Sequence, residues 1–152
     1  MITQRAAYSY QDDPSVAAFD DGGCVAVMDA QCGLCAKGAR WIDRYDKREE
    51  FRIIPVQSDL GSALLLHFGL DPDDPTSWLL IVDGQASSSL EAFMRAGRRL
   101  GGVWRALRVF SILPRRLQDP LYRFVARNRY KFFGRTDLCA LPDPEVQKRL
   151  LK

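Results

Sequence analysis

The pattern of apolar and polar positions along the chain predicts short strands that alternate with amphipathic helices. Apolar runs, bounded by glycine, proline or aspartate, predict strands at 24–28, 51–56, 78–82 and, more weakly, 85–88. Apolar residues at helical spacing predict helices at 32–48, 59–68 and 90–100. Ser58 and Gly69 are suited to begin and end the short middle helix. Pro55 indicates that the second strand lies at an edge or is ending there.

This order of elements, β-α-β-α-β-β-α, is typical of an α/β sheet. Strands that alternate with helices imply parallel pairing through right-handed crossovers. The dipeptide Asp83-Gly84 predicts a tight hairpin, which adds an antiparallel pair. Two further helices are expected at 103–113 and 120–133, where Asp119 is suited to cap the second and Gly134 to end it.

Length and composition indicate one globular domain with a core. The chain has 152 residues, of which 47% are hydrophobic and 27% charged. We expect a mobile extension over residues 1–22, the folded domain over 23–140 and a tail over 141–152. No apolar run approaches the roughly 20 residues that cross a bilayer, and the first residues do not resemble a signal peptide. A reducing cytoplasm is the expected compartment.

Charge is distributed unevenly along the chain. The net charge is +3, yet residues 1–94 hold 7 basic and 15 acidic side chains, whereas residues 95–135 hold 12 basic side chains and one acidic. In the last predicted helix the cations Arg123, Arg127 and Lys131 recur at spacing four, and four apolar positions suit a core: Leu121, Phe124, Val125 and Phe132. A solvated basic face is the preferred interpretation, and binding to nucleic acid or a membrane is the alternative.

The dithiol Cys32-Gly33-Leu34-Cys35 is the clearest candidate for chemistry. At the start of a helix, positions i and i+3 lie on one face, close enough for a disulfide. The unpaired N–H groups and the helix dipole favour a thiolate at Cys32, which would attack a substrate disulfide. Cys35, one turn later and shielded, would resolve the mixed disulfide. This chemistry needs no cofactor beyond the Cys32–Cys35 disulfide.

Other thiols and the single histidine leave alternatives open. A zinc site would combine the dithiol with two more ligands from a small set: Cys24, Cys139 and His67. Because no second Cys-x-x-Cys occurs, zinc is the weaker interpretation. Cys24 and Cys139 are more simply explained as small apolar residues, and His67 as a residue at a helix end.

The motif Asp-x-x-Cys-x-x-Cys stands at residues 29–35. Further motifs are the hairpin at 80–84, the stretch 98–102, the corner 113–115, the late segment 126–130 with Phe133-Gly134, and Cys139. Together these motifs resemble the DCC family of predicted thiol-disulfide oxidoreductases, which looks like a branch of the thioredoxin-like superfamily. The resemblance covers roughly residues 24–139. It implies a thioredoxin-like core with two additional C-terminal helices, Cys32 and Cys35 as the redox pair, and Asp29 as their acidic neighbour.

The resemblance also raises questions about two positions. Many thioredoxin-like proteins place a cis-proline before the third strand, and the matching position here falls near Thr76, one residue after Pro75. Asp29 has two interpretations: a proton relay for Cys35 with a pKa raised by burial, or a structural carboxylate that binds loop amides.

The expected function is therefore thiol-disulfide exchange with protein or small-molecule thiols and disulfides as partners. Nucleic acid is not an expected partner. The alternative is a binding module, in which the dithiol holds a metal ion or is idle and the basic helices recruit an acidic partner.

Overall fold

The computed structural model describes residues 2–74, 76–102, 105–106, 109, 112, 114–136 and 144–151. Within these ranges, one four-stranded sheet has the order β2-β1-β3-β4, formed by β1 (Cys24–Met28), β2 (Phe51–Pro55), β3 (Leu79–Val82) and β4 (Gln85–Ser87). The helices are α1 (Gly33–Tyr45), α2 (Asp59–His67), α3 (Ser89–Leu100), α4 (Arg115–Phe133) and α5 (Pro144–Lys148), with a 3₁₀ turn at Ser9–Asp12. The elements predicted before residue 101 are confirmed close to their expected positions, and β2 lies at an edge, as Pro55 suggested.

The sheet is mixed rather than mainly parallel. β1 pairs in parallel with β2, from Cys24 opposite Phe51 to Met28 opposite Pro55. β3 pairs antiparallel with β1 and with β4. The expectation of parallel pairing was therefore right for β2 and wrong for β3.

The connection between β2 and β3 explains this difference. The nine residues of α2 carry the chain about 13 Å, away from the edge at which β2 ends. The irregular stretch between α2 and Trp78 is long enough to carry the chain back. β3 consequently starts near the carboxyl end of β1, with Leu79 opposite Val27, and runs in the opposite direction.

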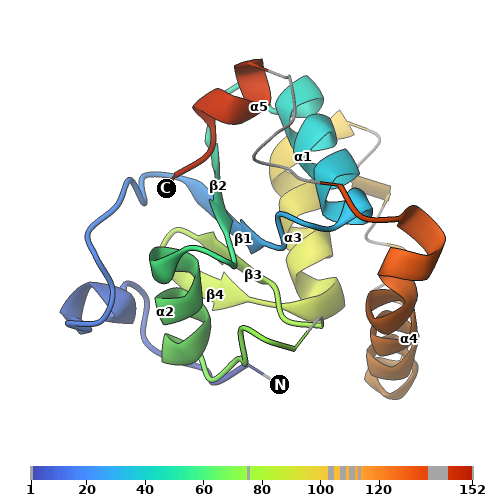
Figure 1. Cartoon of the computed structure of the whole chain (residues 1–152), viewed down its shortest axis with the longest axis horizontal. Helices are drawn as coiled ribbons and strands as arrows, with labels where there is room; N and C mark the ends of the chain where they lie inside the picture. The colour runs from blue at the N-terminus through green and yellow to red at the C-terminus, as the bar shows by residue number, and fades with distance from the viewer. Residues whose placement is uncertain are drawn as a thin grey trace.

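Helices cover both faces of the sheet, which gives the molecule two hydrophobic clusters (Figure 1). Cys24, Ala26 and Met28 of β1 face a cluster that includes residues of α1 and α3. Val25 and Val27 face the other cluster, which includes residues of α2 and of the N-terminal segment. This arrangement, with a β-α-β-α-β-β-α order, is the predicted thioredoxin-like α/β core with additional C-terminal helices.

Residues 2–22, where we expected a mobile extension, pack against this core. Tyr10 is only 1% exposed, and its hydroxyl donates to Asp21 at 3.0 Å. His67, the sole histidine of the chain, lies buried between Ser9 Oγ at 2.9 Å and Asp13 Oδ2 at 2.6 Å. The buried Tyr10 ring, the two contacts of His67 and backbone hydrogen bonds from Thr3 and Tyr8 thus hold a segment whose sequence has no regular period.

The end of the chain, where we expected a tail, also packs against the domain. Ile53 donates its N–H to Arg149 O at 2.8 Å and accepts from Leu151 N at 2.8 Å, so residues 149–151 cover the edge of β2. The buried Arg149 guanidinium donates to Asp46 at 2.6 Å and to Asp43 at 3.0 Å, both in or just after α1. These contacts protect an edge that would otherwise offer free backbone groups.

α4 differs from its prediction in where it begins. It starts at Arg115 rather than at Pro120, and Leu117 and Gln118 both donate their N–H groups to Pro114 O. Pro120 costs the helix one backbone hydrogen bond near its start, which the remaining turns tolerate. The helix predicted over 103–113 falls mostly on residues outside the described ranges, as does Cys139.

The assignment of apolar α4 residues to the core was largely wrong. Leu121, Phe124 and Phe132 are exposed, and Val125 is half-buried. The side of α4 that faces the domain instead carries Ala126 and Arg129, both buried.

Candidate active site

The dithiol motif lies where β1 passes into α1. β1 ends at Met28, residues 29–31 form the turn, and Cys32 takes the extended N-cap conformation immediately before α1. Cys35 lies one turn into the helix, on the face toward the core. This is the strand, motif and helix arrangement that the sequence predicted.

The two thiols differ in acidity because they share one proton. The Cys35 S–H donates to Cys32, and the N–H groups of Cys35 and Leu34 also point at the Cys32 sulfur. With the positive charge of Arg129, these contacts outweigh burial and lower the pKa of Cys32 to about 6. The hydrogen bond to Cys32, followed by burial, raises the pKa of Cys35 far above its usual range.

The exposure of the two thiols is opposite to our expectation. Cys32 is 0% exposed, whereas Cys35, expected to be the shielded thiol, is half-buried. The backbone at Cys32 pairs with residues that follow α4, which the sequence did not place near the motif.

These residues, Gly134 to Thr136, lie across the motif and are called the 134–136 segment below. Gly33 N donates to Gly134 O at 3.1 Å, and Thr136 N donates to Gln31 O at 3.1 Å. Arg135 and Cys32 form an antiparallel bridge between these two contacts. The close approach also explains the glycine at position 33, because a Cβ there would overlap the Phe133 carbonyl oxygen.

Asp29 lies at the centre of a polar cluster in which Asp29 and Arg129 are buried, Tyr130 is half-buried and Gln57 is exposed. Its Oδ1 accepts from Gln31 N at 2.8 Å and from Gln57 Nε2 at 2.7 Å. Its Oδ2 accepts from Arg129 Nη2 at 2.5 Å and from the Tyr130 hydroxyl. This Asp29 cluster ties the dithiol turn to α4, a hundred residues later in the chain.

The surroundings of Asp29 differ from those that the proton-relay interpretation assumed. Burial alone would raise its pKa, but the hydrogen bonds from Tyr130, Gln31 and Gln57 and the charge of Arg129 hold the pKa below its usual range. A carboxylate that stays ionised and has four donors favours the structural interpretation. Asp29 binds a loop amide, as that interpretation expected, and also anchors Arg129.

Arg129 is the residue that sequence reasoning missed. Its side chain is buried, its Nε has no hydrogen-bond partner among the residues that the structure describes, and its positive charge acts on both thiols. Arg129 and Tyr130 lie in the late segment that carries part of the family resemblance, but no local pattern assigns them to the dithiol. The one available signal was its spacing, four residues after Val125 and three before Phe132, which places an arginine beside the apolar positions of the predicted helix.

A cleft of about 550 Å³ opens beside the Asp29 cluster. It is lined by Asp29, Gln57, Arg129 and Tyr130 of the cluster together with Val56, Ser62, Pro72, Asp73, Asp74 and Ser77. The cleft therefore lies at the sheet edge where β1 and β2 end and β3 begins, the same edge that carries the dithiol.

At the position where a cis-proline was expected, the chain has Thr76, whose backbone contacts α4. Thr76 O accepts from the Tyr122 hydroxyl of α4 at 2.8 Å. The described peptide bonds are all trans, and Pro75 lies outside the described ranges. A hydrogen bond from α4 therefore occupies the Thr76 carbonyl, which precedes β3.

The remaining candidate residues lie apart from the dithiol. Cys24 is a buried residue of β1, as predicted, and burial raises the pKa of its thiol to about 11. His67 contacts the N-terminal segment on the other face of the sheet. Among the described residues, no three cysteine, histidine or acidic side chains are grouped as a metal site would need.

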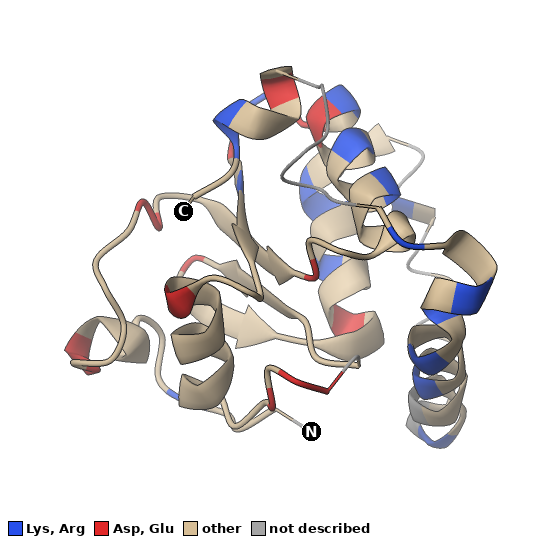
Figure 2. Cartoon of the chain, in the orientation of Figure 1, with Lys and Arg blue, Asp and Glu red and all other residues tan. Residues whose placement is uncertain are grey.

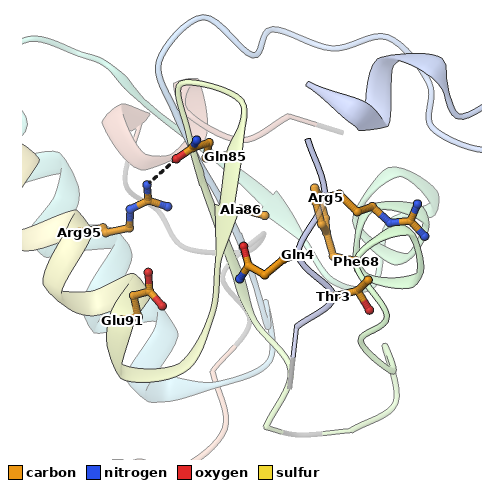
Figure 3. Close-up of a pocket in the computed structure, with 8 residues that line it drawn as sticks. All are labelled: Thr3, Gln4, Arg5, Phe68, Gln85, Ala86, Glu91 and Arg95. Carbon is orange, nitrogen blue, oxygen red and sulfur yellow. Dashed lines mark hydrogen bonds between the residues drawn. The ribbon is translucent and has the colours of Figure 1, made fainter. Parts of the chain in front are cut away.

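A smaller hollow of about 140 Å³ lies between β4, α3 and the N-terminal segment. Figure 3 shows the residues around it, among them Arg95, which donates to Gln85 Oε1 at 3.1 Å. None of its lining residues belongs to the dithiol motif or to α4. We assign it no role in the chemistry of the dithiol.

The sheet and the Cys-x-x-Cys pair at the start of α1 are those of thioredoxin-like proteins that carry a dithiol. Within this class, the chain belongs to the DCC1-like thiol-disulfide oxidoreductase family, whose model matches residues 26–135. The match extends from β1 through the Asp29 cluster to Arg135 of the 134–136 segment.

Relatives support the same family. The uncharacterized protein YuxK of Bacillus subtilis is 35% identical over 127 residues, which cover 84% of this chain and 93% of YuxK. A DCC family protein of Arabidopsis thaliana, described as chloroplastic, is 32% identical over 123 residues, or 80% of this chain and 72% of that protein. A glutamyl-Q tRNA(Asp) synthetase of Burkholderia orbicola is 30% identical over 76 residues, which are 50% of this chain and 26% of the synthetase. No solved structure matches the chain.

Proposed function

We propose that the protein exchanges disulfides with protein or small-molecule substrates through Cys32 and Cys35. The observation that carries the proposal is the pair of thiols at the start of α1, joined by a hydrogen bond that makes one sulfur acidic and keeps the other protonated. Family membership supports the same chemistry. The site needs no cofactor other than the disulfide that the two thiols can form.

The reaction runs in two steps. The Cys32 thiolate attacks one sulfur of the substrate disulfide, so a bond from Cys32 to the substrate forms and the substrate disulfide breaks, releasing one thiolate. Cys35 then loses its proton to solvent and attacks Cys32, which forms the Cys32–Cys35 disulfide and releases the second substrate thiolate. The substrate gains two electrons and the protein loses them. A thiol reductant returns the protein to its starting state.

In this proposal Arg129 is the counter-charge of the site. A buried guanidinium held by Asp29 stabilises the negative sulfur before attack and again when Cys35 ionises. Asp29 then serves as a positioning residue that fixes Arg129 and the turn before Cys32. We assign it this role in place of proton relay.

Attack also requires that Cys32 be uncovered. The 134–136 segment is joined to the motif by two backbone hydrogen bonds, one to Gly33 and one to Gln31. An extended substrate backbone can make equivalent bonds when it displaces the segment, so the exchange leaves few groups unpaired. We propose this displacement as the route of entry, and a reducing compartment such as the cytoplasm as the setting that keeps the dithiol reduced.

Turnover of a disulfide substrate tests the proposal. The wild-type protein should reduce insulin in the presence of dithiothreitol faster than dithiothreitol alone. Cys32→Ser should abolish this activity, and Cys24→Ser, which changes a buried thiol at the start of β1, should retain it. Cys35→Ser should accumulate mixed disulfides with substrate, because the second step is lost.

The alternative to this proposal is that the protein is a metal-binding module. Stoichiometric zinc in the purified protein, released when Cys32 and Cys35 are modified, together with no insulin reduction above background, would overturn the proposal.

A further inference from the structure

α4 presents three different sides around its axis. The side toward the domain carries Ala126 and Arg129, both buried, and contacts α1 and α3. The other two sides are largely exposed. One is apolar apart from the half-buried Asn128, whose amide donates to Phe124 O at 2.8 Å, and the other is mainly basic. The exchange chemistry proposed above uses only the buried side.

The first exposed side is apolar. It consists of four large side chains with the following exposed fractions: Leu117 55%, Leu121 47%, Phe124 60% and Phe132 61%. They lie at spacings of four, three and eight, so they share one side of the helix within about 80°. The two phenylalanine rings lie 6.3 Å apart. We call these four residues the apolar stripe.

The second exposed side is basic. Arg116, Arg123, Arg127 and Lys131 are all exposed and, at about 100° per residue, form a row beside the apolar stripe. Within the described part of the chain, α4 has its ion pair at Arg129, and none joins this basic row to a carboxylate. The pKa of Asp74 is lowered mainly by hydrogen bonds from Thr76 and, to a smaller degree, by the charges of Arg127 and Arg123. Figure 2 shows Lys and Arg along α4.

We propose that the apolar stripe and the basic row of α4 dock the protein on the surface of an anionic phospholipid bilayer. Helices that lie in a membrane interface insert Phe and Leu side chains below the headgroups and hold Lys and Arg at the phosphate level. In α4 the two kinds of side chain are sorted into adjacent sides in this way. The charge of the basic row is complementary to anionic headgroups.

Other ligands match this surface less well. A nucleic acid would pair with the basic row but would leave the apolar stripe in water, since its backbone has no apolar surface of that length. A second copy of the chain would cover the apolar stripe but would bring two basic rows close together, and like charges repel. A bilayer satisfies both sides at once.

Docking of this kind is peripheral. None of the described helices is long and apolar enough to cross a membrane. α4 would lie in the plane of the surface with its buried side still packed on the domain. Docking does not depend on the dithiol chemistry, so a variant with both Cys32 and Cys35 changed to serine should dock as the wild type does.

Co-sedimentation of the full chain with vesicles tests the proposal. We expect binding to phosphatidylcholine vesicles that contain phosphatidylglycerol, much weaker binding to phosphatidylcholine alone, and loss of binding at about 0.5 M salt, where charges are screened within about 5 Å. Arg123→Gln with Arg127→Gln should weaken binding to the anionic vesicles only.

The apolar stripe has a matched control elsewhere in the protein. Phe124→Gln should weaken vesicle binding about tenfold or more, because a phenylalanine side chain no longer leaves water. Leu66→Gln, at a position of α2 that is 63% exposed and has no basic row beside it, should not change binding. Circular dichroism checks that both variants remain folded.

Three results would overturn the proposal. The first is no binding to anionic vesicles by folded wild-type protein. The second is vesicle binding that Phe124→Gln and Leu66→Gln leave equally strong. The third is a concentration-dependent dimer, with no vesicle binding, that Phe124→Gln dissociates, which would assign the apolar stripe to a second copy of the chain.

Discussion

Replacing Cys35 with alanine should make Cys32 a weaker acid. The largest contribution to the low pKa of Cys32 is the hydrogen bond donated by the Cys35 thiol. Alanine removes this donor and leaves the backbone N–H groups of residues 34 and 35 and the charge of Arg129 in place. Serine at the same position keeps an O–H donor of similar reach and is the matched control.

The size of the shift follows from the strength of that contact. A hydrogen bond to a charged group contributes about 1.5–3 kcal/mol, and one pKa unit corresponds to about 1.4 kcal/mol. The pKa of Cys32 should therefore rise from about 6 by about 1–2 units in Cys35→Ala. At pH 6.5 the thiolate fraction falls about threefold for the smaller shift and about twenty-fivefold for the larger.

The readout is the midpoint of a pH profile rather than a rate at one pH. A more basic thiolate is a better nucleophile, by about threefold per pKa unit, which offsets part of the lost thiolate. Alkylation of Cys32 by iodoacetamide, followed by mass spectrometry from about pH 4 to about pH 9.5, gives the midpoint directly. The reasoning is refuted if Cys35→Ala and Cys35→Ser share one midpoint, or if the wild-type midpoint lies near the ordinary value of about 8.5.

Three further predictions concern residues around the dithiol. Arg129→Gln should raise the midpoint of Cys32 alkylation by about one unit while Arg129→Lys leaves it nearer to wild type; equal midpoints would exclude the counter-charge role. Gly33→Ala should lower the free energy of unfolding in urea, because the methyl group meets the Phe133 carbonyl, whereas Gly38→Ala, with open space, should raise it by about 1 kcal/mol. The pKa of Asp29 is depressed in the folded protein, so the stability that its carboxylate gives the fold is present above pH 3.8 and is lost as the pH falls through the lower folded pKa. Asp29→Asn should therefore unfold more easily at pH 7 and lose this acid dependence of stability. If the variant responded to acid as the wild type does, that result would count against the buried ion pair.

The sequence predicted those parts of the fold that depend on local pattern. Ser58 caps α2 with a hydrogen bond from Gly61 N at 3.1 Å, and the turn at Gly84 joins β3 to β4 as expected. The direction of β3 could not be predicted in this way, because it depends on the path of an irregular connection. The packing of Tyr10 and Arg149 was missed for a related reason, since one buried side chain leaves no periodic signal.

The same distinction between local and long-range features applies to the candidate site. Cys32 and Cys35 were identified because their spacing and their place at the start of a helix are local features. Arg129 was missed because its partner, Asp29, is a hundred residues away and only the fold brings them together. On α4 the sequence showed apolar and basic positions but not which side packs on the domain. The contacts of Arg129 with Asp29 turn α4 so that Leu121 and Phe124 remain outside.

A redox titration of the dithiol tests the central claim most directly. The purified protein, equilibrated in glutathione and dithiothreitol buffers of graded potential and then alkylated, should show one two-electron transition between a dithiol and a Cys32–Cys35 disulfide. Its midpoint should fall between roughly −270 and −120 mV, the range of thioredoxin, glutaredoxin and related dithiols. If instead Cys32 and Cys35 remain alkylated separately at every potential, no redox pair forms and the account is wrong.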